Sequence, residues 1–454
     1  MKKLIETLKN IWQIKELRER LVYTLIMLAI FRLGSYIILP GIDAEALAAS
    51  NSQNTNDLLG LLNMFTGGAF NNAAIFALGI MPYITASIII QLLGFAVPYF
   101  QRLQQKEGES GRRKLTQITR WLTVLITLVQ GGTYLKYLYG INGAVSPDVP
   151  GAVFWFSNII ILSAGTIFAM WLGERITDKG IGNGVSLLIT IGIIAALPQA
   201  FVFEGQSQQA LLFVIELAVF FLVILATVAI VQAVRRIPIQ FAKRMVGRSA
   251  GHIPLAGKRD YVPIKVNAAG VMPIIFAQAI MFLPATVAQF VAGPNSDISA
   301  NPILQQLLNP FSFLSSIIAF VLVVVFTYVY TALMVNPQQY AEYLKRQNAF
   351  IPGIKPGKAT AEFIDVVTTR VTLPGSIFLG LITILPAIAV AFGVNQGFAI
   401  FFGGTSLLII VAVVLDTLQQ IESYLLMSKY DGLVKSGRIK GRSSGGMQPI
   451  GASM

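Results

Sequence analysis

The sequence contains ten apolar runs, and each is long enough to cross the roughly 30 Å hydrocarbon core of a bilayer as an α-helix. The runs cover residues 21–39, 73–97, 117–138, 153–173, 184–203, 210–234, 267–291, 311–335, 371–392 and 399–424. Only 12% of the residues are charged, against about 25% in soluble domains. The sequence therefore predicts an all-α polytopic membrane protein with ten transmembrane helices.

Basic residues are distributed unevenly among the segments that connect these runs. All of the 34 Lys and Arg residues except Arg32 and Lys136 fall in 1–20, 98–120, 174–182, 235–265, 336–370 and 428–454. Because cytoplasmic segments carry the excess of Lys and Arg, these segments and both chain ends are predicted to be cytoplasmic. Arg32 lies toward the far end of the first run and could extend to the opposite surface. The net charge of +13 then reflects this asymmetry and requires no nucleic-acid substrate.

Two similar motifs lie half a chain apart. They are Gly79-Ile80-Met81-Pro82-Tyr83-Ile84 and Gly270-Val271-Met272-Pro273-Ile274-Ile275. A proline inside a membrane helix removes a main-chain donor and weakens the helix there, and paired interruptions of this kind point to a central pathway. The motifs therefore predict an internally duplicated membrane protein.

The number of runs in each half fixes how the two copies are related. Each half holds five runs, so a second copy must enter the membrane upside down, as an inverted repeat with a vestibule between the halves. The predicted parts are a cytoplasmic segment 1–20, a first half 21–203, a second half 204–427 and a cytoplasmic tail 428–454.

Residues that commonly carry chemistry are scarce. The chain has no Cys and a single His, His252, which excludes disulfides, thiolate metal sites and histidine metal clusters. Nucleotide-binding and hydrolase motifs are also missing, so we expect no metal, no cofactor and no enzyme. Ion-coupled carriers usually bury titratable groups, and here the acidic candidates within runs are Glu216, near the outer end of the sixth run, and Asp416, toward the inner end of the tenth. A ten-span secondary transporter with an inverted repeat remains the alternative, supported by Pro82 and Pro273 alone.

A series of motifs resembles the SecY family of channel subunits in bacterial protein translocases, from about Arg18 to Ser428. In order they are Phe31-Arg32-Leu33-Gly34-Ser35, Pro40-Gly41-Ile42-Asp43, Gly67-Gly68-Ala69, Ile75-Phe76-Ala77-Leu78 leading into the first Pro motif, Lys106-Glu107-Gly108-Glu109-Ser110-Gly111-Arg112-Arg113-Lys114, Gly180-Ile181-Gly182-Asn183-Gly184, Lys265-Val266-Asn267, Pro352-Gly353-Ile354 and Gly403-Gly404-Thr405-Ser406-Leu407-Leu408-Ile409. The resemblance implies two pseudo-symmetric five-helix halves around a central hourglass pore that conducts unfolded polypeptides.

The resemblance also assigns parts to that pore. Aligning the motifs implies a pore ring of Ile80, Ile84, Ile189, Ile275 and Ile409. The stretch 61–72 resembles the family's plug, a short helix that fills the outer funnel at rest, with Phe65, Gly67, Gly68, Ala69 and Phe70. The second and seventh runs would form a lateral gate for signal sequences and membrane helices. Thr85, Gln91 and Gln278 would either hydrogen-bond across this gate or satisfy main chain near the prolines.

The resemblance further implies partners. The cytoplasmic loops 235–265 and 336–372 would dock the motor ATPase SecA or the translating ribosome through basic residues suited to rRNA phosphates. These residues are Arg235, Arg236, Lys243, Arg244, Arg248, Lys258, Arg259 and Lys355. Lys355 stands where the family typically has Arg, so a contact that needs a planar bidentate donor is in doubt. SecE and SecG would be the partner subunits, nascent polypeptides the substrate, and the bacterial plasma membrane, with its lipid bilayer, the location.

Overall fold

The computed structural model describes residues 14–51, 63–105, 107–141, 143–146, 149–207, 210–241, 259–278 and 311–435, with the single positions 12, 280, 281, 306 and 309. Its first half contains α2 (Lys15–Gly34), α3 (Ala44–Asn51), α5 (Met81–Ala96), α6 (Pro98–Gln105), α7 (Gly108–Tyr139), α8 (Gly151–Lys179) and α9 (Gly184–Ser207). Its second half contains α10 (Ala210–Gln232), β1 (Val234–Phe241), β2 (Arg259–Lys265), α13 (Phe313–Met334), α14 (Pro337–Arg346), β3 (Ala349–Phe350), α15 (Lys358–Ala391), α16 (Gln396–Ala399) and α17 (Gly404–Lys435).

The predicted all-α multi-pass architecture is confirmed. Within the described residues, six helices are long and apolar enough to cross a membrane, and α5 with α6 forms a further candidate bent by 103°. Helices α2 and α7 also coincide with predicted runs, but they carry charges near their ends. The seventh predicted run is described as helix over 272–278 and at 280–281. Ten spans are consistent with this arrangement.

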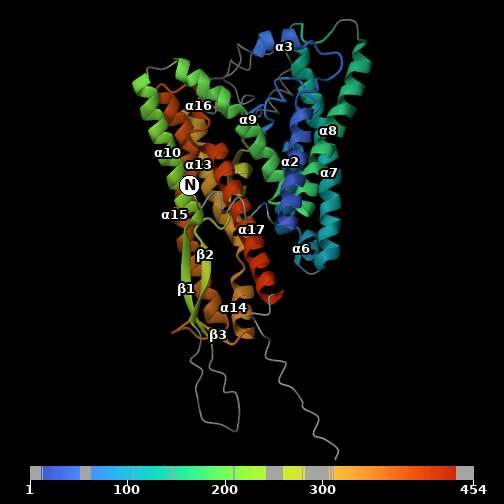
Figure 1. The fold of residues 1–454 in the computed structure, drawn as a ribbon. Coiled ribbons are helices and arrows are strands. Elements are labelled where there is room, and N and C mark those ends of the chain that lie inside the picture. Colours follow the sequence, from blue (N-terminus) through green and yellow to red (C-terminus); the bar gives the residue numbers. More distant parts are fainter. Residues whose placement is uncertain are drawn as a thin grey trace, which may run out of the picture.

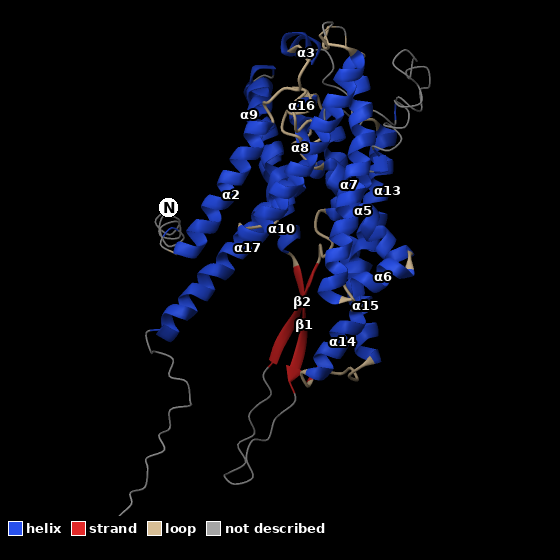
Figure 2. Cartoon of the chain, turned by 90° about the vertical axis from the view of Figure 1, so that its right-hand side faces the viewer, coloured by secondary structure: helices blue, strands red, loops and turns tan. Residues whose placement is uncertain are grey.

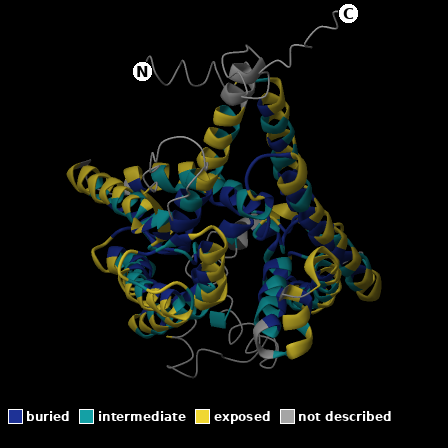
Figure 3. Ribbon diagram, turned by 90° about the horizontal axis from the view of Figure 1, so that it is seen from below, coloured by how far each residue is buried: buried dark blue, intermediate teal, exposed yellow. Residues whose placement is uncertain are grey.

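The helices of the two halves stand on either side of a central region (Figure 1). Seen along the helices, buried residues concentrate toward the centre and many exposed residues face outward (Figure 3). Many of the outward residues are large and apolar, such as Leu211, Phe221 and Leu222 on α10. Exposed apolar side chains along the outer face of a helix suit contact with lipid rather than water.

The long cytoplasmic loops predicted from the sequence contain a small sheet, which was not expected from their length and charge. Strands β1 and β2 form an antiparallel hairpin in which Arg236 pairs with Pro263, and β3 joins the far end of β1 at Gln240 and Phe241. The sheet projects from one end of the helices (Figure 2). Ile237 and Ile239 alternate with exposed residues along β1 and pack against α14 and the start of α15. This two-residue period is the signature of a half-buried strand.

The two proline motifs begin helices and do not interrupt them. These prolines lie inside the apolar runs 73–97 and 267–291, whereas α5 begins at Met81 and its counterpart begins at Met272. Pro82 and Pro273 therefore lie in the first turn, where a missing N–H costs no helical hydrogen bond. Gly79 and Gly270 precede the two helices with φ of +54° and +65°. The sequence repeat is thus also a repeat of backbone conformation.

These two glycines give a test of the repeated turn. Gly270→Ala should lower the free energy of unfolding by about 1 to 2 kcal/mol, because an L-residue is strained at positive φ. No further steric cost is expected, because nothing lies within 4 Å of the added Cβ. Gly79→Ala should cost more, because its Cβ would also lie 3.0 Å from Thr66 Cγ2. Thermal unfolding of the purified protein measures both. Gly397→Ala, in α16 with open space and no positive φ, is the control and should not lower stability. Equal stability of all three variants would contradict the assigned turn.

Candidate pore and plug

Five isoleucines from both halves meet at the centre of the molecule. Ile80 and Ile84 are at the start of α5, Ile189 is on α9, Ile409 is on α17, and Ile275 is in the helical segment after Gly270. Four are buried, and Ile275 is half-buried against the same hydrophobic cluster. We call this set the central cluster. The structure therefore brings together all five residues that the resemblance assigned to a ring.

The plug segment lies against this cluster. Met64, Phe65 and Ala69 are buried in it together with the isoleucines. The short helix expected over 61–72 ends early: residues 63–65 are helical, successive turns follow from Thr66, and residues 61 and 62 lie outside the described residues. Gly67 and Gly68 explain the difference, because their φ values of +65° and +91° are left-handed and cannot continue an α-helix.

Main chain packs directly on main chain between the plug segment and α9. A Cβ added to Gly192 would lie 2.6 Å from the carbonyl oxygen of Phe65 and 3.1 Å from the amide nitrogen of Gly67. A Cβ added to Gly67 would lie 2.9 Å from the Cα atom of Gly192. Such distances leave no room for any side chain at either position. Two glycines thus set how deeply the plug segment reaches into the centre.

The far end of the plug segment is anchored to the first half. The Tyr134 hydroxyl on α7 donates a hydrogen bond to the Phe70 carbonyl at 2.6 Å, and the two rings lie 4.7 Å apart. Ile38 and Ala74 form an isolated antiparallel bridge, and the Leu39 amide donates to the Ala73 carbonyl at 2.9 Å. These contacts fix one end of the segment while its other end packs on the central cluster.

Arg32 also contacts the plug segment, a contact that hydropathy alone does not predict. Rather than extending to the outer surface, its guanidinium donates from Nη1 to the Gly67 carbonyl and from Nη2 to the Tyr36 hydroxyl at 2.9 Å. It also lies over the Tyr36 ring, 4.9 Å from its centroid. The signal in the sequence was the charge itself, since an ionisable residue inside an apolar run is costly and usually functional.

The three polar residues assigned to the lateral gate form hydrogen bonds with other residues and not with one another. Thr85 donates to the Met81 carbonyl at 3.1 Å, which matches the alternative that it satisfies main chain beside Pro82. Gln91 donates to the Ser87 hydroxyl on the same helix at 3.2 Å. Gln278 donates to the Thr405 hydroxyl at the start of α17 at 2.8 Å. Direct bonding among these three residues is therefore not how the described segments are held together.

The basic residues assigned to partner binding lie at the sheet end where they are described. Arg235, Arg236 and Arg259 are exposed on the β1–β2 hairpin, and Lys355 is exposed in the loop between β3 and α15. The main-chain carbonyl of Lys355 accepts a hydrogen bond from the Thr360 hydroxyl at 2.9 Å. The other four residues, Lys243, Arg244, Arg248 and Lys258, lie outside the described residues.

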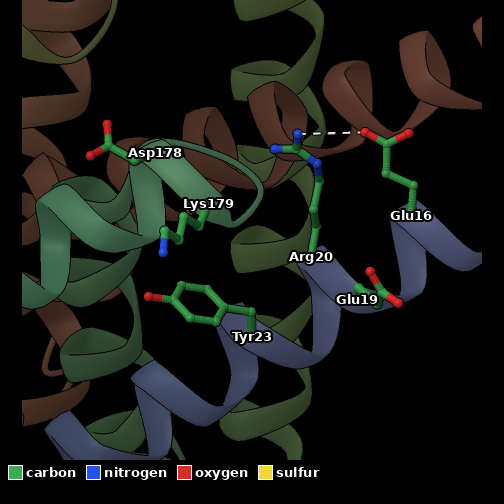
Figure 4. Close-up of a pocket in the computed structure, with 6 residues that line it drawn as sticks. All are labelled: Glu16, Glu19, Arg20, Tyr23, Asp178 and Lys179. Atoms are coloured by element: carbon green, nitrogen blue, oxygen red, sulfur yellow. Dashed lines mark ion pairs between the residues drawn. The ribbon is translucent and has the colours of Figure 1, made fainter.

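A hollow of about 360 Å³ opens between the start of α2 and the end of α8 (Figure 4). Its walls are formed by Glu16, Glu19, Arg20, Tyr23, Asp178 and Lys179. Arg20 forms an ion pair with Glu16 at 3.5 Å and lies over the Tyr424 ring of α17. None of the lining residues belongs to the central cluster, so the hollow is separate from the candidate pore.

The two acidic candidates within the predicted runs do not reach the centre. Asp416 on α17 is exposed, Glu216 on α10 is half-buried, and neither belongs to the central cluster. Within the described residues, no three His, Cys, Asp or Glu side chains gather where they could hold a metal ion. A coupling site of the kind that ion-driven carriers use is therefore not formed around the five isoleucines.

The family model for SecY matches residues 74–418, which include all five isoleucines of the central cluster. The chain belongs to the SecY family. "Protein translocase subunit SecY" of Chlamydia muridarum is 38% identical over 462 residues, covering 96% of this chain and 99% of the relative. The SecY subunit of Thermus thermophilus is 42% identical over 451 residues, covering 96% of this chain and 100% of the relative.

Solved structures share the fold of this SecY-family chain. "The structure of a protein conducting channel" matches with a TM-score of 0.63 and 19% identity, over 92% of this chain and 94% of the other. A structure described as showing that the plug domain of the SecY protein stabilises the closed channel matches with a TM-score of 0.61 and 20% identity over the same shares. Sec61 in the canine ribosome–channel complex matches at 0.57 and 17%, again over 92% and 94%.

The contact between Gly192 and the plug segment in this SecY-family chain is testable. Gly192→Ala should lower the free energy of unfolding by about 1 to 3 kcal/mol, because the added methyl group must displace the main chain at Phe65. Thermal unfolding in detergent gives the change. Gly205→Ala near the end of the same helix meets only Phe213 at 3.8 Å and should be neutral or slightly stabilising. If the two variants unfold alike, the plug does not pack on α9 as described.

Proposed function

We propose that this chain is the central subunit of a protein-conducting channel. It would move unfolded secretory polypeptides across the membrane and release transmembrane helices sideways into lipid. The observation that carries the proposal is the convergence of five isoleucines from both halves, covered by the buried segment that includes Phe65. The near full-length relatives named protein translocase subunit SecY support it.

The chemistry of the central cluster suits a pore that must stay sealed around very different sequences. Isoleucine is β-branched and stiff at χ1, so the constriction keeps its shape. It offers no hydrogen-bonding group, so a passing polypeptide finds nothing specific to bind. A narrow apolar constriction also sheds water, which bars ions without any fixed charge. Residues 63–70 would add a second seal when the channel is at rest.

Helix α5 and the segment after Gly270 are the proposed walls of the lateral gate. Both begin at the central cluster, because Ile80 and Ile84 belong to one and Ile275 to the other. A segment in the pore could then be sorted by its own solvation. Leu or Ile at a helix centre favours insertion by roughly 0.3 to 0.6 kcal/mol, whereas Asp, Lys or Arg opposes it by roughly 2.5 to 3.5 kcal/mol.

The proposed partners act mainly at the sheet end. The hairpin, α14, the start of α2 and the end of α17 all lie toward that end (Figure 2), which fits the predicted cytoplasmic side of a bacterial plasma membrane with both chain ends inside. We assign docking of the SecA motor or the ribosome to the exposed arginines of the hairpin and to Lys355. The ribosome-bound state of the Sec61 structure that shares this fold supports such docking. SecE and SecG would complete the complex.

Cross-linking at Ile80 tests the pore directly. The chain has no native Cys, so Ile80→Cys provides a single thiol at the constriction. In membranes that contain the partner subunits, a stalled secretory precursor with a cross-linkable residue should form adducts at this position. Leu222→Cys on the exposed face of α10, where the side chain is 65% exposed, is the control and should form none. An engaged precursor that leaves position 80 unlabelled would remove the pore assignment and reopen the transporter alternative.

The docking role of the hairpin has its own test. Exchanging Arg235 and Arg236 for Glu should weaken binding of ribosomes or SecA to the purified complex, and most strongly at low salt, because phosphate and carboxylate contacts are screened by ions. Co-sedimentation across a salt series measures the effect. The matched control exchanges Arg112 and Arg113 for Glu; both are exposed at the start of α7. Equal loss with both pairs would mean that net charge, and not this surface, governs binding.

A further inference from the structure

We propose that Arg32 is a latch residue, a side chain that holds the plug segment closed by donating a hydrogen bond to the Gly67 carbonyl. This inference rests on the proposed function, because it assumes that the segment at 63–70 moves when the channel opens. Arg32 acts here as a positioning residue. It lies on α2 and is not a member of the central cluster.

The first support is the position of the charge. Arg32 is half-buried in the last turn of α2, inside an apolar run that includes Phe31 and Leu33. The ion pairs formed within the described part of the chain do not include Arg32. Its guanidinium is therefore held by neutral oxygen atoms and an aromatic face. A half-buried charge within an apolar run needs a reason, and the contact to the plug segment supplies one.

The second support is the acceptor. The Gly67 carbonyl lies between two left-handed residues of a segment that packs on the central cluster at Phe65. A hydrogen bond from a charged donor is about twice as strong as one between neutral groups. Arg32 therefore contributes more to holding this segment than an ordinary main-chain turn does. Gly67 is also the residue whose main chain touches Gly192, so the latch acts where the segment is packed most tightly.

The third support is the space around Gly67. A Cβ added there would lie 2.7 Å from Nη1 of Arg32, so the guanidinium occupies the volume that a side chain would take. On the other side of the guanidinium, the Tyr36 ring is 60% exposed. When the plug segment leaves, Arg32 keeps its Tyr36 contact and can exchange the Gly67 carbonyl for water. The hydrogen bond thus exists in the closed state alone, as a latch requires.

The experiment measures plug closure without relying on transport. Thr66 is 1% exposed, so a Thr66→Cys thiol should react slowly with a polar maleimide while the plug is closed. The full-length chain, assembled with SecE and SecG in nanodiscs, is labelled in four backgrounds: wild type, Arg32→Met, Arg32→Lys and Arg18→Met. Arg18 is an exposed residue on the same helix and serves as the matched loss of charge. Thermal unfolding of each variant checks its assembly, and Arg32→Gln replaces the Met variant if that one does not assemble.

We expect Arg32→Met to raise the resting labelling rate roughly tenfold or more, the factor that loss of a charged hydrogen bond implies. The labelling rate of Arg32→Lys should lie between those of Arg32→Met and wild type, and the rate of Arg18→Met should equal that of wild type. Equal rates for Arg32→Met and Arg18→Met would overturn the latch. Adding precursor, SecA and ATP separates failure of the latch hypothesis from failure of the proposed channel function. If precursor raises the labelling rate in wild type, the proposed channel function is supported even when Arg32→Met has no effect. If precursor never raises the labelling rate, the plug role of this segment is wrong.

Discussion

Hydrocarbon offers no hydrogen-bond partners, so every main-chain N–H and C=O inside the membrane must be satisfied within the protein. The long helices meet this requirement by themselves, but residues 66–80 do not, because they form successive turns. These turns are tolerated because neighbouring side chains supply partners: the Tyr134 hydroxyl donates to the Phe70 carbonyl, and Arg32 donates to the Gly67 carbonyl. Residues 66–80 can therefore lie outside a helix because helices of the first half donate to them and the central cluster packs against them.

Much of this arrangement follows from the sequence. Ten apolar runs and the distribution of Lys and Arg predict the architecture and its basic end, and the family motifs lead to the five isoleucines that the fold brings together. What pattern alone cannot give is where a run stops being helical. Residues 73–80 are as apolar as a helix, yet Gly79 at positive φ and Pro82 in the first turn delay the helix until Met81.

Two other features depended on tertiary contacts. Hydropathy marks Arg32 as an anomaly, but it cannot say whether the side chain turns outward to water or inward to Gly67, because that choice is made by a segment far along the chain. The sheet was missed for a different reason. Its β1 strand alternates at Ile237 and Ile239, but the loop was judged by its length and charge, and the helices that cover the strand come much later in the sequence.

The repeated turn at Gly79 and Gly270 has an electrostatic consequence. Each turn starts a helix whose first residues adjoin the central cluster, and Ile80, at the N-cap of α5, has no side-chain group to cap the free N–H groups. A helix amino end carries the equivalent of about half a positive charge. Two such ends therefore meet at a constriction that contains no formal charge. In the proposed pore, these two backbone dipoles would disfavour cations at the constriction, in addition to the exclusion of water by the apolar side chains.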